Sequence, residues 1–174
     1  LVNDGKNRFT NRVLLDKATR VTYVAAADFN RDGLPDLIVG QFGYVEGEIR
    51  WMENLGDWQF KSHPLLDLSG TIQSPAADMN GDGLFDVVGL VSQDSEEVHL
   101  LQGSQFAHFR DRVLYGSTNK DYGSSGLTIA DVNRDGRPDI VDTNGDGFDY
   151  ATPGLRPWHG VQWLENAGQG KFVF

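Results

Sequence analysis

The stretch Asp28-Phe-Asn-Arg-Asp-Gly-Leu-Pro-Asp36 decides the fold of this chain, because its pattern returns twice. It recurs as Asp78-Met-Asn-Gly-Asp-Gly-Leu-Phe-Asp86 and as Asp131-Val-Asn-Arg-Asp-Gly-Arg-Pro-Asp139, and the starts lie 50 and 53 residues apart. Chance does not produce Asp-x-Asn-x-Asp-Gly-x-x-Asp three times at near-constant spacing. A period of about 50 residues indicates a repeat architecture, and β-propeller blades have periods of this length.

A second landmark repeats in the same phase. Trp51-Met-Glu-Asn-Leu-Gly-Asp-Trp-Gln-Phe60 matches Trp163-Leu-Glu-Asn-Ala-Gly-Gln-Gly-Lys-Phe172, and the middle copy, Leu101-Gln-Gly-Ser-Gln-Phe106, is degenerate. The repeat boundaries that follow are approximately 9–59, 60–108 and 109–171, with 1–8 as the tail of a preceding blade and 172–174 as the start of the next.

Each repeat contains short apolar or alternating segments bounded by turn residues. In the first repeat the expected strands are Val21–Ala27, Leu37–Gly40, Glu48–Glu53 and Phe60–Leu66. No 3.6-residue period persists, so we predict an all-β chain of propeller blades, each with four antiparallel strands. Propellers close with about 4–8 blades. Three repeats therefore belong to a larger ring, completed by further chain or by another copy.

The acidic loops offer an oxygen-only set of ligands. Side chains at loop positions 1, 3, 5 and 9 carry oxygen, the carbonyl at position 7 can add one more, and the Gly at position 6 allows a sharp turn. Such a set suits Ca²⁺, which takes about 6–8 oxygen ligands, better than zinc or copper, which prefer His or Cys. Without a cation, the three aspartates of one loop repel each other.

Two other interpretations of these loops are weaker. Asp, Asn and Gly are common turn formers, but that preference does not explain three copies in register. An EF-hand requires Glu at position 12 and flanking helices, whereas position 12 is Val39, Gly89 or Asp142 and the flanks are strand-like.

The loops and the Trp-x-Glu-Asn-x-Gly-x-x-x-Phe segments resemble the FG-GAP/VCBS repeats of integrin-α-like propellers over essentially the whole chain. The resemblance implies a ring of about seven blades, with one calcium ion held between the first two strands of each blade. The middle blade departs from the pattern by lacking the Trp-Glu-Asn segment, which puts its outer hairpin in doubt. The implied ligands are Asp28, Asn30, Asp32, Leu34 and Asp36; Asp78, Asn80, Asp82, Leu84 and Asp86; and Asp131, Asn133, Asp135, Arg137 and Asp139, with the residues at position 7 acting through backbone oxygens.

The third repeat carries an insertion, 142–160, between its expected second and third strands. Long loops on rigid scaffolds often carry binding functions. Four of its residues, Asp142, Asn144, Asp146 and Asp149, offer oxygens for a fourth cation, although the last acid stands one position early. The alternative is an ordered loop that packs Tyr150 and Trp158 on a neighbouring blade.

The composition of the chain disfavours several classes of function. The chain has 25 acidic and 15 basic residues and a net charge of −10, which disfavours nucleic acid as a partner. There is no cysteine, no apolar run long enough to span a membrane and no Gly-x-Ser-x-Gly motif. We expect His63, His99, His108 and His159 to be surface or packing residues, and Trp51 and Trp163 to lie in the blade core.

These observations predict a non-enzymatic, calcium-binding propeller module of a secreted, cell-surface or periplasmic protein. It would act in protein or carbohydrate binding, adhesion or assembly. Two alternatives stay open. The module could belong to a larger extracellular lyase or redox enzyme with the 142–160 loop at its site, or it could be a structural subunit of a larger complex.

Overall fold

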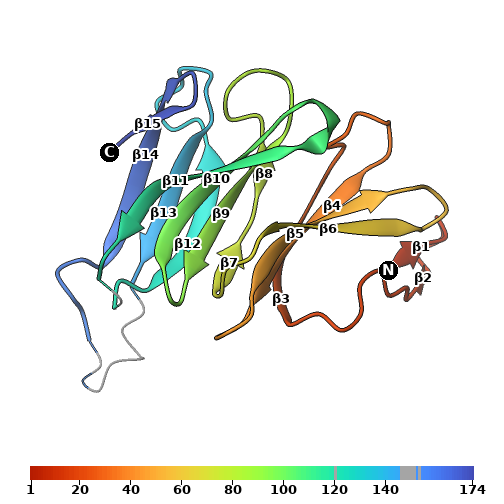
Figure 1. Ribbon diagram of the computed structural model, residues 1–174, viewed down its shortest axis with the longest axis horizontal. Coiled ribbons are helices and arrows are strands. Elements are labelled where there is room, and N and C mark those ends of the chain that lie inside the picture. The colour runs from red at the N-terminus through yellow and green to blue at the C-terminus, as the bar shows by residue number, and fades with distance from the viewer. Residues whose placement is uncertain (120, 146–151, 153) are drawn as a thin grey trace.

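The computed structural model describes residues 1–119, 121–145, 152 and 154–174, and its regular structure is almost entirely β. Three antiparallel sheets stand side by side, and each contains one of the three acidic loops (Figure 1). One short 3₁₀ turn, η1 (Gln105–Ala107), is the only helical element among the described residues. The all-β prediction, with blades of four antiparallel strands, is confirmed.

The first blade follows the predicted order of strands. Its sheet order is β3-β4-β5-β6, so each strand pairs with the next one in the chain. The strands are β3 (Arg20–Ala27), β4 (Asp36–Phe42), β5 (Glu48–Asn54) and β6 (Phe60–Leu66). The acidic loop 28–36 joins β3 to β4, and the Asx turn after Asn54, in which its Oδ1 accepts the N–H of Gly56 at 3.0 Å, helps to turn β5 into β6.

The second blade has an interrupted innermost strand. β7 (Thr71–Gln73) and β8 (Ala76–Ala77) both pair with β9 (Asp86–Ser92), and Pro75 lies in the gap between them. Proline has no N–H to donate, and for this reason it breaks a ladder at the edge of a sheet. The blade continues with β10 (Glu96–Gly103) and β11 (Phe109–Ser117).

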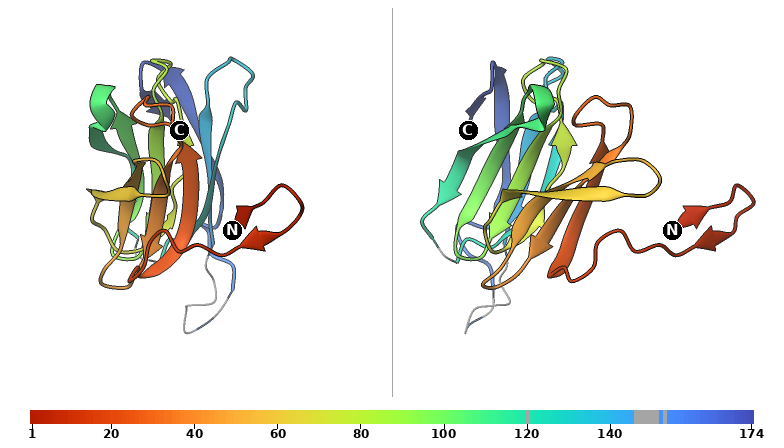
Figure 2. Two further views of the ribbon diagram at one scale, coloured as in Figure 1. Left: turned by 90° about the vertical axis from the view of Figure 1, so that its right-hand side faces the viewer. Right: turned by 45° about the vertical axis from the view of Figure 1, so that its right-hand side comes forward.

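The third blade has the order β12-β13-β14-β15. Its strands are β12 (Ser124–Ala130), β13 (Asp139–Asn144), β14 (Gly160–Gly168) and β15 (Lys171–Val173). A separate hairpin of β1 (Val2–Asn3) and β2 (Phe9–Thr10) stands away from the blades (Figure 2).

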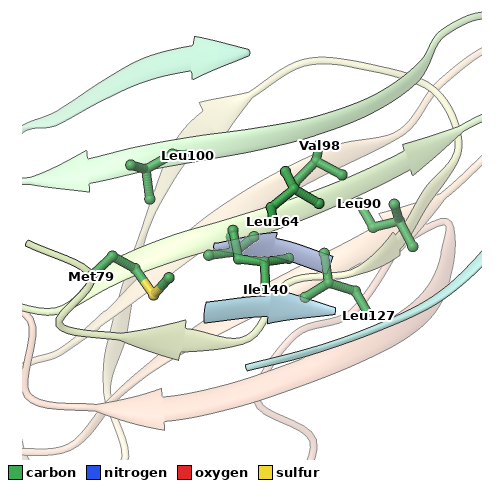
Figure 3. Packing of buried hydrophobic residues seen from close by; sticks show 8 residues of the cluster. Met79, Leu90, Val98, Leu100, Leu127, Ile140 and Leu164 are labelled. Carbon is green, nitrogen blue, oxygen red and sulfur yellow. The ribbon is translucent and has the colours of Figure 1, made fainter. Parts of the chain in front are cut away.

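The hydrophobic core lies between blades. One cluster joins the second blade to the third (Figure 3). It contains Met79, Val88, Leu90, Val98, Leu100, Leu127, Ile140 and Leu164. A second cluster joins the first blade to the second through Phe29, Ile38, Ile49, Trp51, Val87, Leu101 and Ala107. The apolar residues of β9 therefore alternate between two neighbours, as expected for a strand that is covered on both faces.

The two equivalent tryptophans differ in burial. Trp51 is 6% exposed and packs against the second blade, whereas Trp163 is 40% exposed. The blade-core prediction is correct for Trp51 and wrong for Trp163 in this chain. The reason is geometric: among the described residues, no further sheet covers the face of the third blade on which Trp163 lies.

Candidate metal centres

The three acidic loops lie along one edge of the row of blades, at the top in Figure 1. Their backbones share two left-handed residues, at positions 4 and 6. Position 4 is Arg31, Gly81 or Arg134, with φ of 61°, 78° and 63°, and position 6 is Gly33, Gly83 or Gly136, with φ of 86°, 78° and 87°. Glycine adopts positive φ without steric cost, which accounts for its presence at position 6 in every copy.

The carboxylate at position 1 closes each loop from inside. In the first loop, Asp28 accepts the N–H groups of Asp32 at 3.1 Å and Gly33 at 2.9 Å. Asp78 and Asp131 accept the equivalent pairs, at 3.2 and 2.7 Å and at 3.0 and 2.9 Å. Backbone N–H groups thus hold the loop around this carboxylate.

Positions 3 and 5 form a second, smaller ring of bonds. Asn30 Oδ1 accepts the N–H of Asp32 at 3.0 Å, and its Nδ2 donates to Asp32 Oδ2 at 3.0 Å. Asp32 Oδ1 in turn accepts the N–H of Leu34 at 2.8 Å. The same three bonds recur in the second and third loops. The three loops therefore have the same local structure.

The aspartate at position 9 is completely buried and fastens the loop to the blade. Asp86 accepts the N–H of Met79 at 2.9 Å on one oxygen and that of Gly103, at the end of β10, at 2.8 Å on the other. Asp36 and Asp139 make the same two bonds in their own blades. Sequence reasoning assigned this residue to the metal alone and missed its structural role. No sequence signal separates it from the other loop aspartates, because Asp is equally invariant at positions 1 and 5.

Burial and crowding raise the pKa of two of these aspartates. Desolvation is the largest cause for Asp86 and raises its pKa to about 6, against the N–H bonds from Gly103 and Met79. The charges of Asp82 and Asp78 add to the increase. Desolvation likewise raises the pKa of Asp36, and the charge of Asp32 contributes. The loops thus carry an excess of negative charge that a cation would relieve.

The third loop differs because its own chain supplies a cation. Arg137, at position 7, forms an ion pair with Asp135, and its Nε donates to the carbonyl of Asn166 at 2.7 Å. Burial opposes ionisation of Asp135, but the N–H of Arg137, the amide of Asn133 and the guanidinium together hold its pKa below the usual value. Leu34 and Leu84 occupy this position in the other loops.

The donor chemistry of the loops fits calcium. Each carboxylate oxygen of the first loop accepts one hydrogen bond from within the protein, and an ionised carboxylate has room for more than one partner at each oxygen. Within the described ranges, however, no three His, Cys, Asp or Glu side chains come together as a ready-made metal cluster. The oxygens at positions 1, 3, 5, 7 and 9 therefore remain predicted ligands.

The structure also places two of the histidines and part of the 142–160 loop. His63 stacks on Trp51 and its Nε2 lies 2.8 Å from Glu53, and the two ring nitrogens of His99 contact Asp111 and Glu97 at 2.9 and 3.1 Å. In the 142–160 loop, the indole N–H of Trp158 donates to the carbonyl of Asp121 at 2.9 Å. Asp142 and Asn144 lie on β13, whereas Asp146, Asp149 and Tyr150 lie outside the described residues.

A comparison with known protein families supports the repeat that the sequence predicts. The family model described as FG-GAP-like repeat matches residues 1–39 and 78–141, which is more than half of the chain. No match is found among curated proteins. The matched segments contain all three acidic loops, 28–36, 78–86 and 131–139. The chain belongs to the FG-GAP-like repeat family, and its three sheets are propeller blades of that family.

Proposed function

We propose that this chain is a non-catalytic, calcium-stabilised propeller module of an extracellular, cell-surface or periplasmic protein, and that it binds a protein or carbohydrate partner. FG-GAP repeats are typical of extracellular proteins and often bind calcium. The observation that carries the calcium part is the recurrence of the same oxygen-lined loop at one edge of all three blades.

The loops are placed where an ion would support the structure. Each loop joins the first two strands of its blade, and its buried position-9 aspartate also holds the end of the third strand. A cation bound by positions 1, 3 and 5 would neutralise the crowded carboxylates and fix three strands together. Binding and local folding are then coupled, so calcium increases the stability of the folded chain.

A groove at the loop edge supports the binding part. It has a volume of about 560 Å³ and lies between the first and second loops. Arg31, Asp82, His108 and Arg110 are among its lining residues. Charged groups of both signs on a rigid rim suit a polar partner such as an acidic peptide or a sugar. No helix in the described part of the chain is long and apolar enough to cross a membrane.

Thermal unfolding with and without calcium tests the proposal. We expect EDTA to lower the Tm by several degrees or more, and excess Ca²⁺ to restore it, whereas Mg²⁺ restores less. A matched control is the triple variant Asp32→Asn, Asp82→Asn and Asp135→Asn, whose Tm should not respond to calcium at the loops. A wild-type Tm that is the same in EDTA and in calcium would contradict the proposal.

A further inference from the structure

Asp142 is a buried carboxylate in a position where the other repeats have no polar side chain. It lies on β13 at the position of Val39 in the first blade and Gly89 in the second, and it is 0% exposed. It lies on the same face of the strand as Ile140, which packs in the cluster between the second and third blades. Where the other two repeats have valine and glycine, the third repeat has an acid.

Neither oxygen of this carboxylate has a hydrogen-bond partner among the described residues. Burying a charge without a partner is costly, and native structures rarely leave one in that state. Burial raises the pKa of Asp142 to about 6 and outweighs the opposing effect of the backbone N–H of Asp142 itself. This differs from Asp36, Asp86 and Asp139, whose oxygens all accept backbone N–H groups.

In the described part of the chain, three further buried oxygens near Asp142 also lack partners. They are Oδ1 of Asn144, Oε1 of Gln162 and the hydroxyl of Tyr122. Asn144 and Tyr122 are each 5% exposed. Each of these atoms can accept a hydrogen bond or coordinate a cation.

The register of the sheet brings these oxygens to one place. Gln162 on β14 is the direct cross-strand partner of Asp142, and Asn144 is two residues along β13 on the same face. Tyr122 reaches the same region, since the charges of Asp142 and Glu96 both raise its pKa, after burial and Tyr115. The Tyr115 and Tyr122 rings lie 5.9 Å apart, but their hydroxyls do not form a hydrogen bond.

We propose that Asp142, Asn144, Gln162 and Tyr122 form a cation site between the second and third blades, separate from the acidic loops. Asp142 is the charged ligand, and the two amide oxygens and the phenol are neutral ligands. An oxygen-only set with one carboxylate selects a hard cation such as Ca²⁺, Na⁺ or K⁺, and disfavours zinc and copper. Glu96 lies at the margin of the site, where its carboxylate accepts bonds from Ser92 Oγ and from the N–H of Ser124.

The expected consequence is a reversal in the effect of Asp142→Asn. In a cation-free buffer at pH 8 the variant should melt above the wild type, because it removes an unpaired buried charge. In the buffer with the bound cation it should melt below the wild type, since it removes the charged ligand. Separate series in CaCl₂, KCl and NaCl identify the cation. Asp16→Asn, which neutralises an exposed acid, is the charge-matched control and should melt as the wild type does in every buffer.

The second readout depends on the charge of the ion. If the ion is divalent, native mass spectrometry in calcium counts the bound ions. If it is monovalent, the dependence of the Tm on salt concentration reports its binding. Asp142→Asn should lose one bound calcium, or its response to the monovalent salt. Asp32→Asn loses a loop ion but keeps the ion at Asp142, so failure of the loop sites and failure of this site are distinguishable.

If Asp142→Asn does not fold, Tyr122→Phe should weaken the same binding roughly tenfold. The proposal is wrong if Asp142→Asn, or Tyr122→Phe in its place, changes neither readout. It is also wrong if Asp142→Asn melts above the wild type in all buffers, because none of the added cations then offsets the buried charge of Asp142.

Discussion

The residues of each acidic loop fall into two groups. Position 9 is buried and holds backbone N–H groups from the loop and from the third strand, as Asp86 does with Met79 and Gly103. Position 5 is near the surface and contacts mainly atoms of its own loop, as Asp82 does with Leu84 and Asn80. The sequence pattern treats all four side chains as ligands, but the structure gives position 9 a role that does not depend on metal.

This division predicts different effects for Asp86→Asn and Asp82→Asn. In EDTA, Asp86→Asn should lower the free energy of unfolding by about 1–3 kcal/mol, because the amide cannot accept both backbone N–H groups. Asp82→Asn should change it by less than about 0.5 kcal/mol in EDTA, but should remove the gain from calcium at that loop. Urea unfolding in both buffers measures this. Equal losses for the two variants in EDTA would show that position 9 is not a structural residue.

The raised pKa of Asp86 predicts how the effect of calcium depends on pH. The pKa of about 6 in the folded chain is above the usual 3.8, so the folded chain holds the proton more tightly than the unfolded chain. Without metal, the stability from this group is complete below about pH 4 and is lost as the pH rises through 6. Calcium competes with the proton for the loop carboxylates, so its stabilising effect should grow across the same range. Chemical unfolding from pH 4 to 8, with and without calcium, tests this, and a gain that does not change with pH would contradict it.

At the scale of elements, the strand order, the loops and the outer hairpins of the first and third blades follow from the repeat. Asn54 and Asn166 explain the Trp-x-Glu-Asn pattern: each accepts an N–H two residues later, at 3.0 Å, and donates to the carbonyl of a loop proline. Asn166 also donates to the carbonyl of Met79 in the preceding blade at 2.7 Å. The pattern did not reveal this link between blades, because its partner lies 87 residues away.

The degenerate middle hairpin has a steric cause. Gly103 stands where the other blades have Asn, and a Cβ at this residue would lie 2.3 Å from the carbonyl oxygen of Phe85. Restoring the repeat pattern with Gly103→Asn should therefore destabilise the chain by about 1–3 kcal/mol. Thermal unfolding measures this, with Gln102→Glu, which also follows the pattern and keeps the size of the side chain, as the control. A Gly103→Asn variant as stable as the wild type would contradict the steric account.

Arg137 predicts that the third loop binds calcium more weakly than the others. Its guanidinium is paired with Asp135 and must release this carboxylate before a metal can use the same oxygen. Arg137→Leu, which copies the first two loops, should strengthen calcium binding at the third loop by roughly three- to thirtyfold, equivalent to about 1–2 kcal/mol. Calorimetric titration of the two proteins compares the weakest site. Unchanged affinity would mean that the arginine does not compete.

At the scale of the whole molecule, the sequence predicted three blades and the edge that carries their loops. It did not predict which faces pack together. That depends on pairs such as Val98 and Leu127, which are far apart in the chain and meet only in the cluster between blades. It did not distinguish Trp51 from Trp163, and it did not show that Asp142 is buried, because burial there depends on the neighbouring blade.

The central claim is that each acidic loop holds one calcium ion that stabilises its blade. Counting bound calcium by native mass spectrometry, in the wild type and in Asp32→Asn, Asp82→Asn and Asp135→Asn, tests it most directly. We predict that each single variant loses one ion relative to the wild type and that the triple variant loses three. A wild type that binds no calcium, or a count that these substitutions do not change, would contradict the account.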